Sequence, residues 1–540
     1  MGLMTSMTSS SFRRFRDRSI VYVDKSLLIK DILSDDQNNV FLFTRPRRFG
    51  KSMNISMLDA FFNVKYAGNS WFDGLKISDH PECNEYKNKH PVIYMDLKDL
   101  NSRTYELYVG SIKGVICKVC CDHEELLQSD RISDHEMENL NRYVRRNISE
   151  DEIHDCIPNL MRMLEKHYGS KVVVLIDEYD ASVTNMIGKG FQEDELSFLG
   201  IFLSSMLKGN ENLEFAYMTG VTQLAKAGLF SRINNVKVNN ILSRESQERF
   251  GFTEDEVRSL LDEHGYLDKL DEIREHYDGY HFGDQDIYNP FSIMSYLQSF
   301  EPKNYWINTA NNMPIRQIFN NMSNETLVGV VSLLNGGMLH SDILDIHSYE
   351  DLEMPSMETT ISVLAMAGYL SPRKCDDGLY DLKIPNMEVR EGMNYVLSRC
   401  VPLSNNVFSG FNRSLLDLDV ESMEGYLTNV LSRTSYFDMK DESHYCLVIL
   451  LMTTPLTDSY DIRLQVESGN GRVDILFRPI KGGRRPIIIE VKKVDEESKL
   501  EQALDHAMEQ IDDRRYDLGM DGAVRIGMAF CGKVSRVRVG

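Results

Sequence analysis

Phe41-Leu-Phe-Thr-Arg-Pro-Arg-Arg-Phe-Gly-Lys-Ser52 is the stretch of sequence that decides the fold. The apolar run that ends at Phe43 leads into a short polar loop, and an apolar helical pattern restarts at Met53. A strand, a loop and a helix that opens on Gly50-Lys51-Ser52 are typical of a P-loop, which binds the phosphates of a nucleotide. In that arrangement backbone N–H groups face the anion, Lys51 reaches the terminal phosphates and Ser52 ligates Mg²⁺.

The loop departs from the general P-loop pattern at its first position, where glycine is expected and this chain has Arg45. Guanidinium groups bind phosphate bidentately, so Arg47 and Arg48 are candidates for contact with a triphosphate. For Arg45 an alternative stays open, in which its side chain points away and only its backbone lines the loop. The motif is incomplete as written, and the rest of the chain has to support it.

Length and composition limit the class of protein. A chain of 540 residues is too long for one hydrophobic core and predicts about two to four domains. Its 42% hydrophobic and 26% charged residues are typical of a soluble globular protein. No apolar run reaches the roughly 18 residues of a membrane span, and the N-terminus lacks the apolar region of a signal peptide. We therefore expect a cytoplasmic protein without a membrane partner.

The formal net charge of −22 argues against the whole molecule being a general binder of polyanions. It leaves room for a local basic groove. Lys481 to Arg485, together with Lys533, Arg536 and Arg538 near the C-terminus, are the residues that we expect to supply one.

The first half of the chain alternates strand-like and helix-like segments. The strand candidates are Val40–Thr44, Pro91–Leu97, Lys171–Asp177 and Leu213–Gly220. This alternation predicts a parallel sheet with crossover helices on both faces. A capping box at Thr253-Glu254-Asp255-Glu256 marks the start of a mostly helical stretch.

Strands return near the C-terminus, at Ile462–Glu467, Arg472–Arg478 and Pro486–Lys492, and a helix follows from Glu496 to about Arg515. The predicted fold class is α/β, with a P-loop sheet, a helical middle region and a small C-terminal α/β domain. The predicted domains are 1–252, 253–425 and 426–540.

A second element of a nucleotide site follows the run Lys171 to Ile176. Its consecutive apolar residues predict a central strand buried on both faces, and Asp177-Glu178 stands at its carboxyl end, where ligands collect in open α/β sheets. We predict Asp177 as the metal-side carboxylate and Glu178 as the base that orients the attacking water. The alternative is that Asp177 and Glu178 form a capped surface turn without a functional role. Thr219, at the end of another strand, is predicted to bond the water or the γ-phosphate, with a plain strand-ending turn as its alternative.

These segments resemble a known family. They look like motifs of the AAA-ATPase-like family. The segments that carry the resemblance are Tyr22-Val-Asp-Lys25, the RPRRFGKS loop, Leu175-Ile-Asp-Glu-Tyr-Asp180, Thr219-Gly-Val-Thr222 with Leu229-Phe-Ser231, and Tyr277-Asp-Gly-Tyr-His-Phe282 with Tyr288-Asn-Pro-Phe291. Its members are prokaryotic proteins that commonly carry a PD-(D/E)XK nuclease-like domain at the C-terminus. The resemblance implies ATP and Mg²⁺ as cofactors, and it makes the missing glycine typical of the family.

The C-terminal block suggests its own chemistry. Asp474 stands near the start of one strand, and Glu490 and Lys492 lie two apart on the next, so both project to one face. Two carboxylates and a lysine are the minimal set for metal-assisted phosphodiester hydrolysis: the carboxylates hold Mg²⁺, and the lysine positions or activates the nucleophile. A polar hairpin with a solvent-facing Glu-x-Lys pair is the alternative.

The D…E-x-K pattern in a hairpin resembles the PD-(D/E)XK nucleases. The resemblance implies that Glu442 is a further metal ligand and that Gln510 is a polar catalytic residue on the following helix, with Gln502 as the second choice. Three hypotheses follow. The first is an ATPase coupled to a Mg²⁺-dependent nuclease that acts on DNA or RNA. The second is a nucleotide-dependent scaffold whose nuclease fold only binds nucleic acid or a partner, and the third is a nuclease with a degenerate P-loop. A homo-oligomer would allow Arg232 or Arg244 of a neighbouring subunit to complete the ATP site.

Overall fold

The computed structural model describes residues 10–100, 104–181, 192–222, 236–306, 324–334, 336–344, 356–400, 405–433, 441–456, 459–480 and 483–540. The chain divides into two compact units, the first made of residues 1–318 and 341–389 and the second of residues 319–340 and 390–540. Within the part of the chain that is described, no helix combines the length and the apolar character that a membrane crossing requires.

A five-stranded parallel sheet forms the centre of the first unit. Its strands are β1 (Val40–Thr44), β2 (Val92–Asp96), β3 (Val172–Asp177), β4 (Leu213–Gly220) and β5 (Val236–Asn239), in the order β2-β3-β4-β1-β5. Every residue of β1 and β3 is buried, as expected for central strands covered on both faces. Because all strands run the same way, their carboxyl ends meet at one edge of the sheet, where Thr44 pairs with Gly220 and Asp96 with Asp177.

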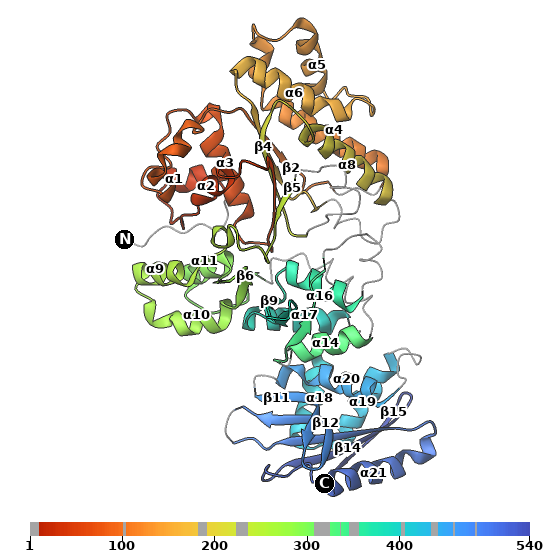
Figure 1. The fold of residues 1–540 in the computed structure, drawn as a ribbon. Helices are drawn as coiled ribbons and strands as arrows, with labels where there is room; N and C mark the ends of the chain where they lie inside the picture. Colours follow the sequence, from red (N-terminus) through yellow and green to blue (C-terminus); the bar gives the residue numbers. More distant parts are fainter. Residues whose placement is uncertain are drawn as a thin grey trace. The chain divides into compact units, whose positions relative to one another are not determined.

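Helices cover both faces of this sheet (Figure 1). One face carries α1 (Phe12–Asp17), α2 (Leu27–Leu33) and α3 (Lys51–Phe62), and the other carries α4 (Tyr105–Cys121), α6 (Ile153–Tyr168) and α8 (Gln192–Leu207), with α5 (Asp134–Val144) packed on α4 and α6. A large hydrophobic core lies between the sheet and α4, α6 and α8. These helices supply apolar residues at helical spacing, so burying that face holds the sheet together.

The rest of the first unit packs beside the P-loop. It contains α9 (Glu254–His264), α10 (Leu270–Tyr277), the hairpin β6 (Tyr280–Phe282) and β7 (Gln285–Ile287), α11 (Pro290–Ser299), α16 (Met357–Met366), β9 (Ser371–Lys374) and β10 (Tyr380–Lys383). The predicted capping box is present, because the Thr253 hydroxyl accepts from the N–H of Glu256 and the Glu256 carboxylate accepts from the N–H of Thr253. Strand β10 also pairs with β8 (Leu339–Ser341), and α17 (Met387–Cys400) follows.

The second unit is built on a mixed sheet. Its strands are β11 (Tyr460–Ser468), β12 (Gly471–Pro479), β13 (Ile487–Lys493), β14 (Val524–Cys531) and β15 (Val534–Val539), in sequential order, and only the β13–β14 pair is parallel. Figure 1 shows α18 (Asn405–Asp417), α19 (Val420–Arg433) and α20 (Glu442–Thr453) near this sheet, with α21 (Leu500–Asp513) nearer the C-terminus. The helix α14 (Asn324–Leu334) contacts α20.

The fold class predicted from sequence is confirmed: an α/β P-loop sheet with helices on both faces, a helical middle and a C-terminal α/β sheet. Strands β1 and β4 have the predicted bounds. The prediction missed β5, β14 and β15 and the small strands β6 to β10. Those of the middle region span only three or four residues each, which is too short for a clear alternating pattern.

Candidate functional site

The loop between β1 and α3 has the geometry of an anion-binding loop. Gly50, the N-cap of α3, has φ = 86°, which glycine adopts freely because it lacks a Cβ. Arg48 also has a positive φ, of 68°. Left-handed residues in such a loop turn successive backbone N–H groups toward one side and so form a concavity that suits an anion. The loop therefore presents N–H groups at the start of a helix of 12 residues.

Lys51 and Ser52 are the first residues of α3, and their side chains make hydrogen bonds at this loop and at the end of β3. The Lys51 ammonium is buried and donates to the backbone oxygens of Arg45, at 3.1 Å, and Pro46, at 3.2 Å. The Ser52 hydroxyl donates a 2.7 Å hydrogen bond to Oδ2 of Asp177. Strand β4 separates β1 from β3 in the sheet, and α3 packs on β3, so the loop and the start of α3 carry Ser52 past β4 to Asp177.

Asp177 lies at the carboxyl end of β3 in a negative environment. Burial, with the charges of Glu178 and Asp96 nearby, raises the pKa of its carboxyl to about 6, against the Ser52 hydrogen bond, which lowers it. Glu178 follows with φ = 53° and is half-buried. The sequence reasoning missed Asp96, whose only signal is its place at the end of another strand of the same sheet.

Thr219 is fully buried at the end of β4. Its hydroxyl oxygen has no hydrogen-bond partner among the described residues, so it is a polar group that lacks a partner at the edge where the phosphates of a nucleotide would lie. Its carbonyl accepts from the N–H of Tyr179.

Asp180 is a residue of this site that the sequence reasoning did not single out. Its Oδ2 accepts from the N–H groups of Val221 and Thr222 and from the Thr222 hydroxyl, at 2.7 to 2.9 Å. A Cβ at Gly220 would lie 2.5 Å from Asp180 Oδ1, so only glycine fits there. Asp180 therefore fixes the turn after β4, and its signal in the sequence is its place at the end of the segment Leu175 to Asp180.

The three arginines of the loop have different surroundings. Arg45 is fully buried: it donates to the backbone and side-chain oxygens of Asn239 at 2.9 and 2.7 Å, and its guanidinium lies 4.7 Å from the centre of the Phe250 ring. Burial lowers the pKa of Arg45 to about 9, which leaves it charged near neutral pH. Of the two possibilities that the sequence left open, the structure shows that the Arg45 side chain points away from the loop. Arg48 is exposed and stacks on Phe291, at 4.9 Å, and Arg47 is half-buried.

A second cluster lies in the second unit, at β12 and β13. Oδ2 of Asp474 accepts from the N–H of Val491 at 2.8 Å, and the Lys492 ammonium donates to Oε1 of Glu490 at 2.8 Å. Glu442, at the start of α20, accepts from the N–H of Lys493 at 3.2 Å. The structure therefore brings together four of the five residues that the sequence predicted for this site, all except Gln510.

Glu490 is the most buried member of this cluster, with 1% of its surface exposed. Burial and the neighbouring Asp474 raise the pKa of its carboxyl to about 7. Burial lowers the pKa of Lys492, but the hydrogen bond and charge of Glu490 outweigh it and leave the pKa raised. Oε2 of Glu490 has no hydrogen-bond partner among the described residues. A buried carboxylate oxygen without a partner beside a second carboxylate fits a Mg²⁺ ion, which prefers oxygen ligands.

Gln510 reaches this cluster only through another residue. Its amide donates to the Tyr516 hydroxyl at 3.1 Å, and that hydroxyl donates to the Arg472 carbonyl, two residues before Asp474. Tyr516 is buried and was not recognised from the sequence. Gln502, the second choice, is exposed.

The basic residues near the C-terminus are largely engaged within the unit. Arg538 pairs with Glu501 and Asp505, Arg536 pairs with Glu424, and Lys533 donates to the Ser432 carbonyl. Acidic residues of α19 and α21 therefore pair with both arginines, and a basic groove formed by these residues with Arg484 and Arg485 stays a prediction. Arg484 and Arg485 are exposed, and Lys481 lies outside the described residues, as does Arg232. Arg244 is 77% exposed and pairs with Asp284 at 2.7 Å.

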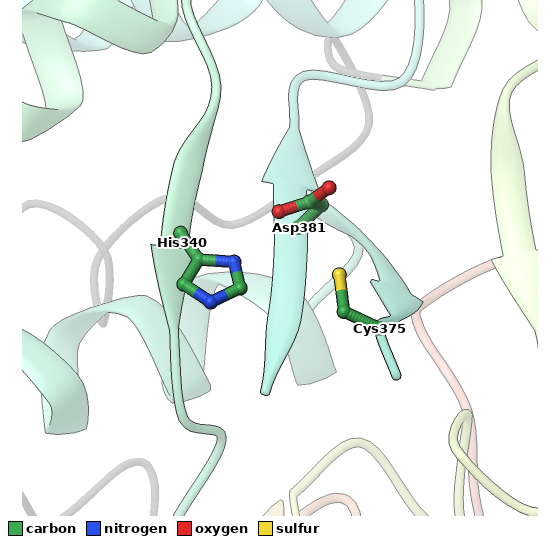
Figure 2. Close-up of side chains that lie close together, drawn as sticks. All are labelled: His340, Cys375 and Asp381. Carbon is green, nitrogen blue, oxygen red and sulfur yellow. The ribbon is translucent and has the colours of Figure 1, made fainter. Parts of the chain in front are cut away.

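A third group of polar side chains is drawn in Figure 2. The figure labels His340, which belongs to the second unit, and Cys375 and Asp381, which belong to the first, directly after β9 and in β10. Burial and the hydrogen bond to Asp381 raise the pKa of the Cys375 thiol, which opposes the thiolate form that binds metals. The division between the two units falls directly after His340, so we assign no metal to this group.

The fold and the two sites define a protein with a P-loop domain of the parallel-sheet type and a nuclease-like α/β domain. Residues 6–230 match the family described as Predicted AAA-ATPase, and residues 440–538 match the PD-(D/E)XK nuclease superfamily. The chain therefore carries an AAA-ATPase-like domain and a PD-(D/E)XK nuclease superfamily domain. It is 26% identical over 484 residues to an uncharacterized protein in the vnfD 5′ region of Azotobacter chroococcum mcd 1, with 84% of this chain and 83% of that protein covered.

Proposed function

We propose that the first unit binds and hydrolyses ATP with Mg²⁺. The hydrogen bond from Ser52 to Asp177 carries this proposal, because it joins the two residues that hold the metal in a P-loop site. The N–H groups of the loop, with Gly50, bind the phosphates, and Lys51 leaves the loop carbonyls to reach them. Arg47 and Arg48 extend the phosphate contacts, and Thr219 donates to the γ-phosphate or the water. Glu178 orients that water as the general base.

Isothermal titration calorimetry of the full chain with ATP and Mg²⁺ tests this proposal. The native chain is expected to release or absorb heat, and the Lys51→Ala variant is not. A native chain that gives no heat would mean that the P-loop is degenerate. A variant that binds as the native chain does would place the nucleotide elsewhere.

We propose that the second unit is a Mg²⁺-dependent nuclease acting on DNA or RNA. The Glu490 oxygen that lacks a partner carries this proposal, because such an atom is costly to bury unless a metal or a proton binds there. Asp474 and Glu490, with Glu442 beside them, would hold the ion, which lowers the pKa of a bound water and stabilises the charge of the transition state. Lys492 positions the nucleophile, and Gln510 supports the strand of Asp474 through Tyr516.

Cleavage of plasmid and single-stranded substrates with Mg²⁺ tests this second proposal, with Glu490→Gln as the inactive variant. Gln keeps the size of the side chain but removes the charge that holds the ion. Equal cleavage by both proteins would eliminate the assignment.

The pairing of Arg536 and Arg538 with acidic side chains favours an alternative, a scaffold whose nuclease fold binds a partner without cleaving nucleic acid. Phosphate contacts dominate nucleic-acid affinity, and these side chains are engaged elsewhere. ATP binding without cleavage by the native chain would support this alternative.

We further propose a cytoplasmic protein that assembles with copies of itself, so that the exposed Arg244 of one subunit completes the ATP site of another. Measuring the mass in solution with and without ATP tests this assembly. A monomer under both conditions would eliminate the role of Arg244.

A further inference from the structure

The backbone of the P-loop is held from outside by one tryptophan. The indole N–H of Trp306 donates a 3.0 Å hydrogen bond to the backbone oxygen of Arg47. Trp306 is 1% exposed and lies in the same compact unit as the loop, 259 residues further along the chain. A long-range bond from a buried side chain to a loop carbonyl fixes the orientation of that peptide group.

This bond completes a series of three consecutive carbonyls. Those of Arg45 and Pro46 accept from Lys51, and the next, that of Arg47, accepts from Trp306. If Lys51 turns toward bound phosphates, the first two carbonyls lose their donor. The third keeps its own, because Trp306 does not depend on Lys51.

The orientation of this peptide group matters for phosphate binding. In a trans peptide the C=O and the following N–H point in opposite directions, so holding the Arg47 carbonyl turns the Arg48 N–H away from Trp306. Arg48 also has the left-handed φ of 68°, a conformation that costs about 1 to 2 kcal/mol for a residue with a side chain. Such a conformation persists where its surroundings impose it, and the Trp306 bond and the Phe291 ring are two of those surroundings.

Trp306 is itself anchored. Its backbone N–H donates at 2.5 Å to the carboxylate of Glu388, which is buried, and the second oxygen of that carboxylate accepts from the Ser292 hydroxyl at 2.7 Å. Its ring packs against Tyr369, with 5.2 Å between centroids. These contacts fix the position of the indole, and the indole N–H in turn fixes the orientation of the Arg47 carbonyl in the loop.

We propose that Trp306 is a positioning residue for the phosphate loop, and that its indole senses occupation of that loop. The inference rests on the proposed nucleotide site and adds to it a residue outside every motif of that site. Phosphate binding and the Trp306 bond stabilise the same loop conformation, so each is expected to strengthen the other.

The chain has two tryptophans, Trp71 and Trp306, so the Trp71→Phe variant reports on Trp306 alone. In this variant of the full chain, we expect the fluorescence of Trp306 to change saturably with ATP and Mg²⁺. Tripolyphosphate with Mg²⁺ should produce the same change, because the contact acts through the phosphates rather than the base. Adding Lys51→Ala should abolish both responses.

Affinity provides the second readout. Trp306→Phe keeps an aromatic ring but removes the donor, and we expect it to weaken ATP binding about fivefold to tenfold, as loss of one hydrogen bond implies. Trp71→Phe is the matched control, since that indole donates to the side chain of Asp17 instead, and should leave the affinity unchanged. Thermal unfolding of both variants shows whether either loses its fold.

The outcomes separate this inference from the proposed function. Absence of heat when the native chain is titrated with ATP would overturn both. Heat with the Trp71→Phe variant, but unchanged Trp306 fluorescence, would overturn the inference alone. So would a folded Trp306→Phe variant that binds ATP with native affinity.

Discussion

The hydroxyl of Ser52 donates a 2.7 Å hydrogen bond to Asp177, although the strands that precede these residues are separated by a third. In the proposed site both side chains serve the same Mg²⁺ ion. We therefore expect Ser52→Ala to weaken ATP binding about tenfold in the presence of Mg²⁺, or about 1.4 kcal/mol, and to have little effect in EDTA. Calorimetry under the two conditions measures this difference.

Ser56→Ala is the matched control, because Ser56 lies one turn further along α3 and accepts from the N–H of Phe12 rather than meeting Asp177. It should leave the affinity for ATP with Mg²⁺ unchanged. An equal loss in both variants, or an equal loss with and without Mg²⁺, would contradict a metal-side role for Ser52.

Glu178 is expected to act on hydrolysis and not on binding. Glu178→Gln keeps the shape of the side chain but removes its ability to accept a proton from the attacking water. We expect ATP affinity to stay within about twofold and hydrolysis to fall by about 10² or more, as for loss of a general base. Phosphate release in a single turnover measures the rate. Hydrolysis at the native rate would show that another group serves as base.

Two adjacent lysines on β13 give a sharp test of the proposed nuclease site. Lys492 pairs with the buried Glu490, whereas Lys493 pairs with the exposed Asp495. We expect Lys492→Ala to lower the rate of Mg²⁺-dependent cleavage by about 10² or more, because the nucleophile loses its positioning group, and Lys493→Ala to change it little. The rate is measured on a defined substrate. A similar loss in both variants would point to general electrostatic attraction of the substrate.

The raised pKa of Glu490 predicts a dependence on pH. Below about 7 this carboxyl holds a proton that competes with Mg²⁺, so metal affinity should rise about tenfold per pH unit up to about 7 and level off above it. The free energy of unfolding of the metal-free protein should change with pH in the opposite direction. The unfolded chain releases this proton near its ordinary pKa of 4.5, so the free energy of unfolding falls as pH rises from about 4.5 to about 7.

Calorimetric titration with Mg²⁺ across this pH range measures the first effect. The Glu490→Gln variant is the control, and its remaining metal affinity should lose the slope below pH 7. A native protein with the same metal affinity at every pH would exclude Glu490 as a ligand.

Arg45 is expected to matter for stability rather than for phosphate contact. Arg45→Ala leaves the buried oxygens of Asn239 without their donor and removes packing from Phe250, at a cost of about 3 kcal/mol. Arg48→Ala, at an exposed position, should cost less than about 1 kcal/mol. Scanning calorimetry of the full chain compares the two. An Arg45→Ala variant as stable as the native chain would contradict the structural role.

Much of the proposed nucleotide site could be predicted from local pattern. The strand ending at Thr44, the helix opening at Lys51 and the buried strand ending at Asp177 are each set by a continuous apolar run or by a glycine with positive φ. Asp96 could not be predicted in this way, because only the pairing of β2 with β3 places it beside Asp177. Asp180 is similar, since its bonds reach the turn after another strand.

The C-terminal site was predictable to a similar degree, and for the same reason. Strand periodicity predicts that Glu490 and Lys492 share a face, with Asp474 on the neighbouring strand. No local pattern predicts that Arg536 and Arg538 pair with acidic side chains. Net charge and clusters of basic residues describe composition. Whether a charge is available depends on which helix packs against its strand.

The sequence by itself determined which residues are candidates for the chemistry, because residue type and spacing specify a loop, a strand end and the groups on one strand face. Only the tertiary structure decided what those groups face. It buried the Arg45 side chain against Asn239, placed Ser52 against Asp177 although β4 lies between their strands, and brought the Trp306 indole to the Arg47 carbonyl from 259 residues away. The physical reason is that such contacts form only when separate elements pack together, and the spacing of residues along the chain does not predict which elements pack.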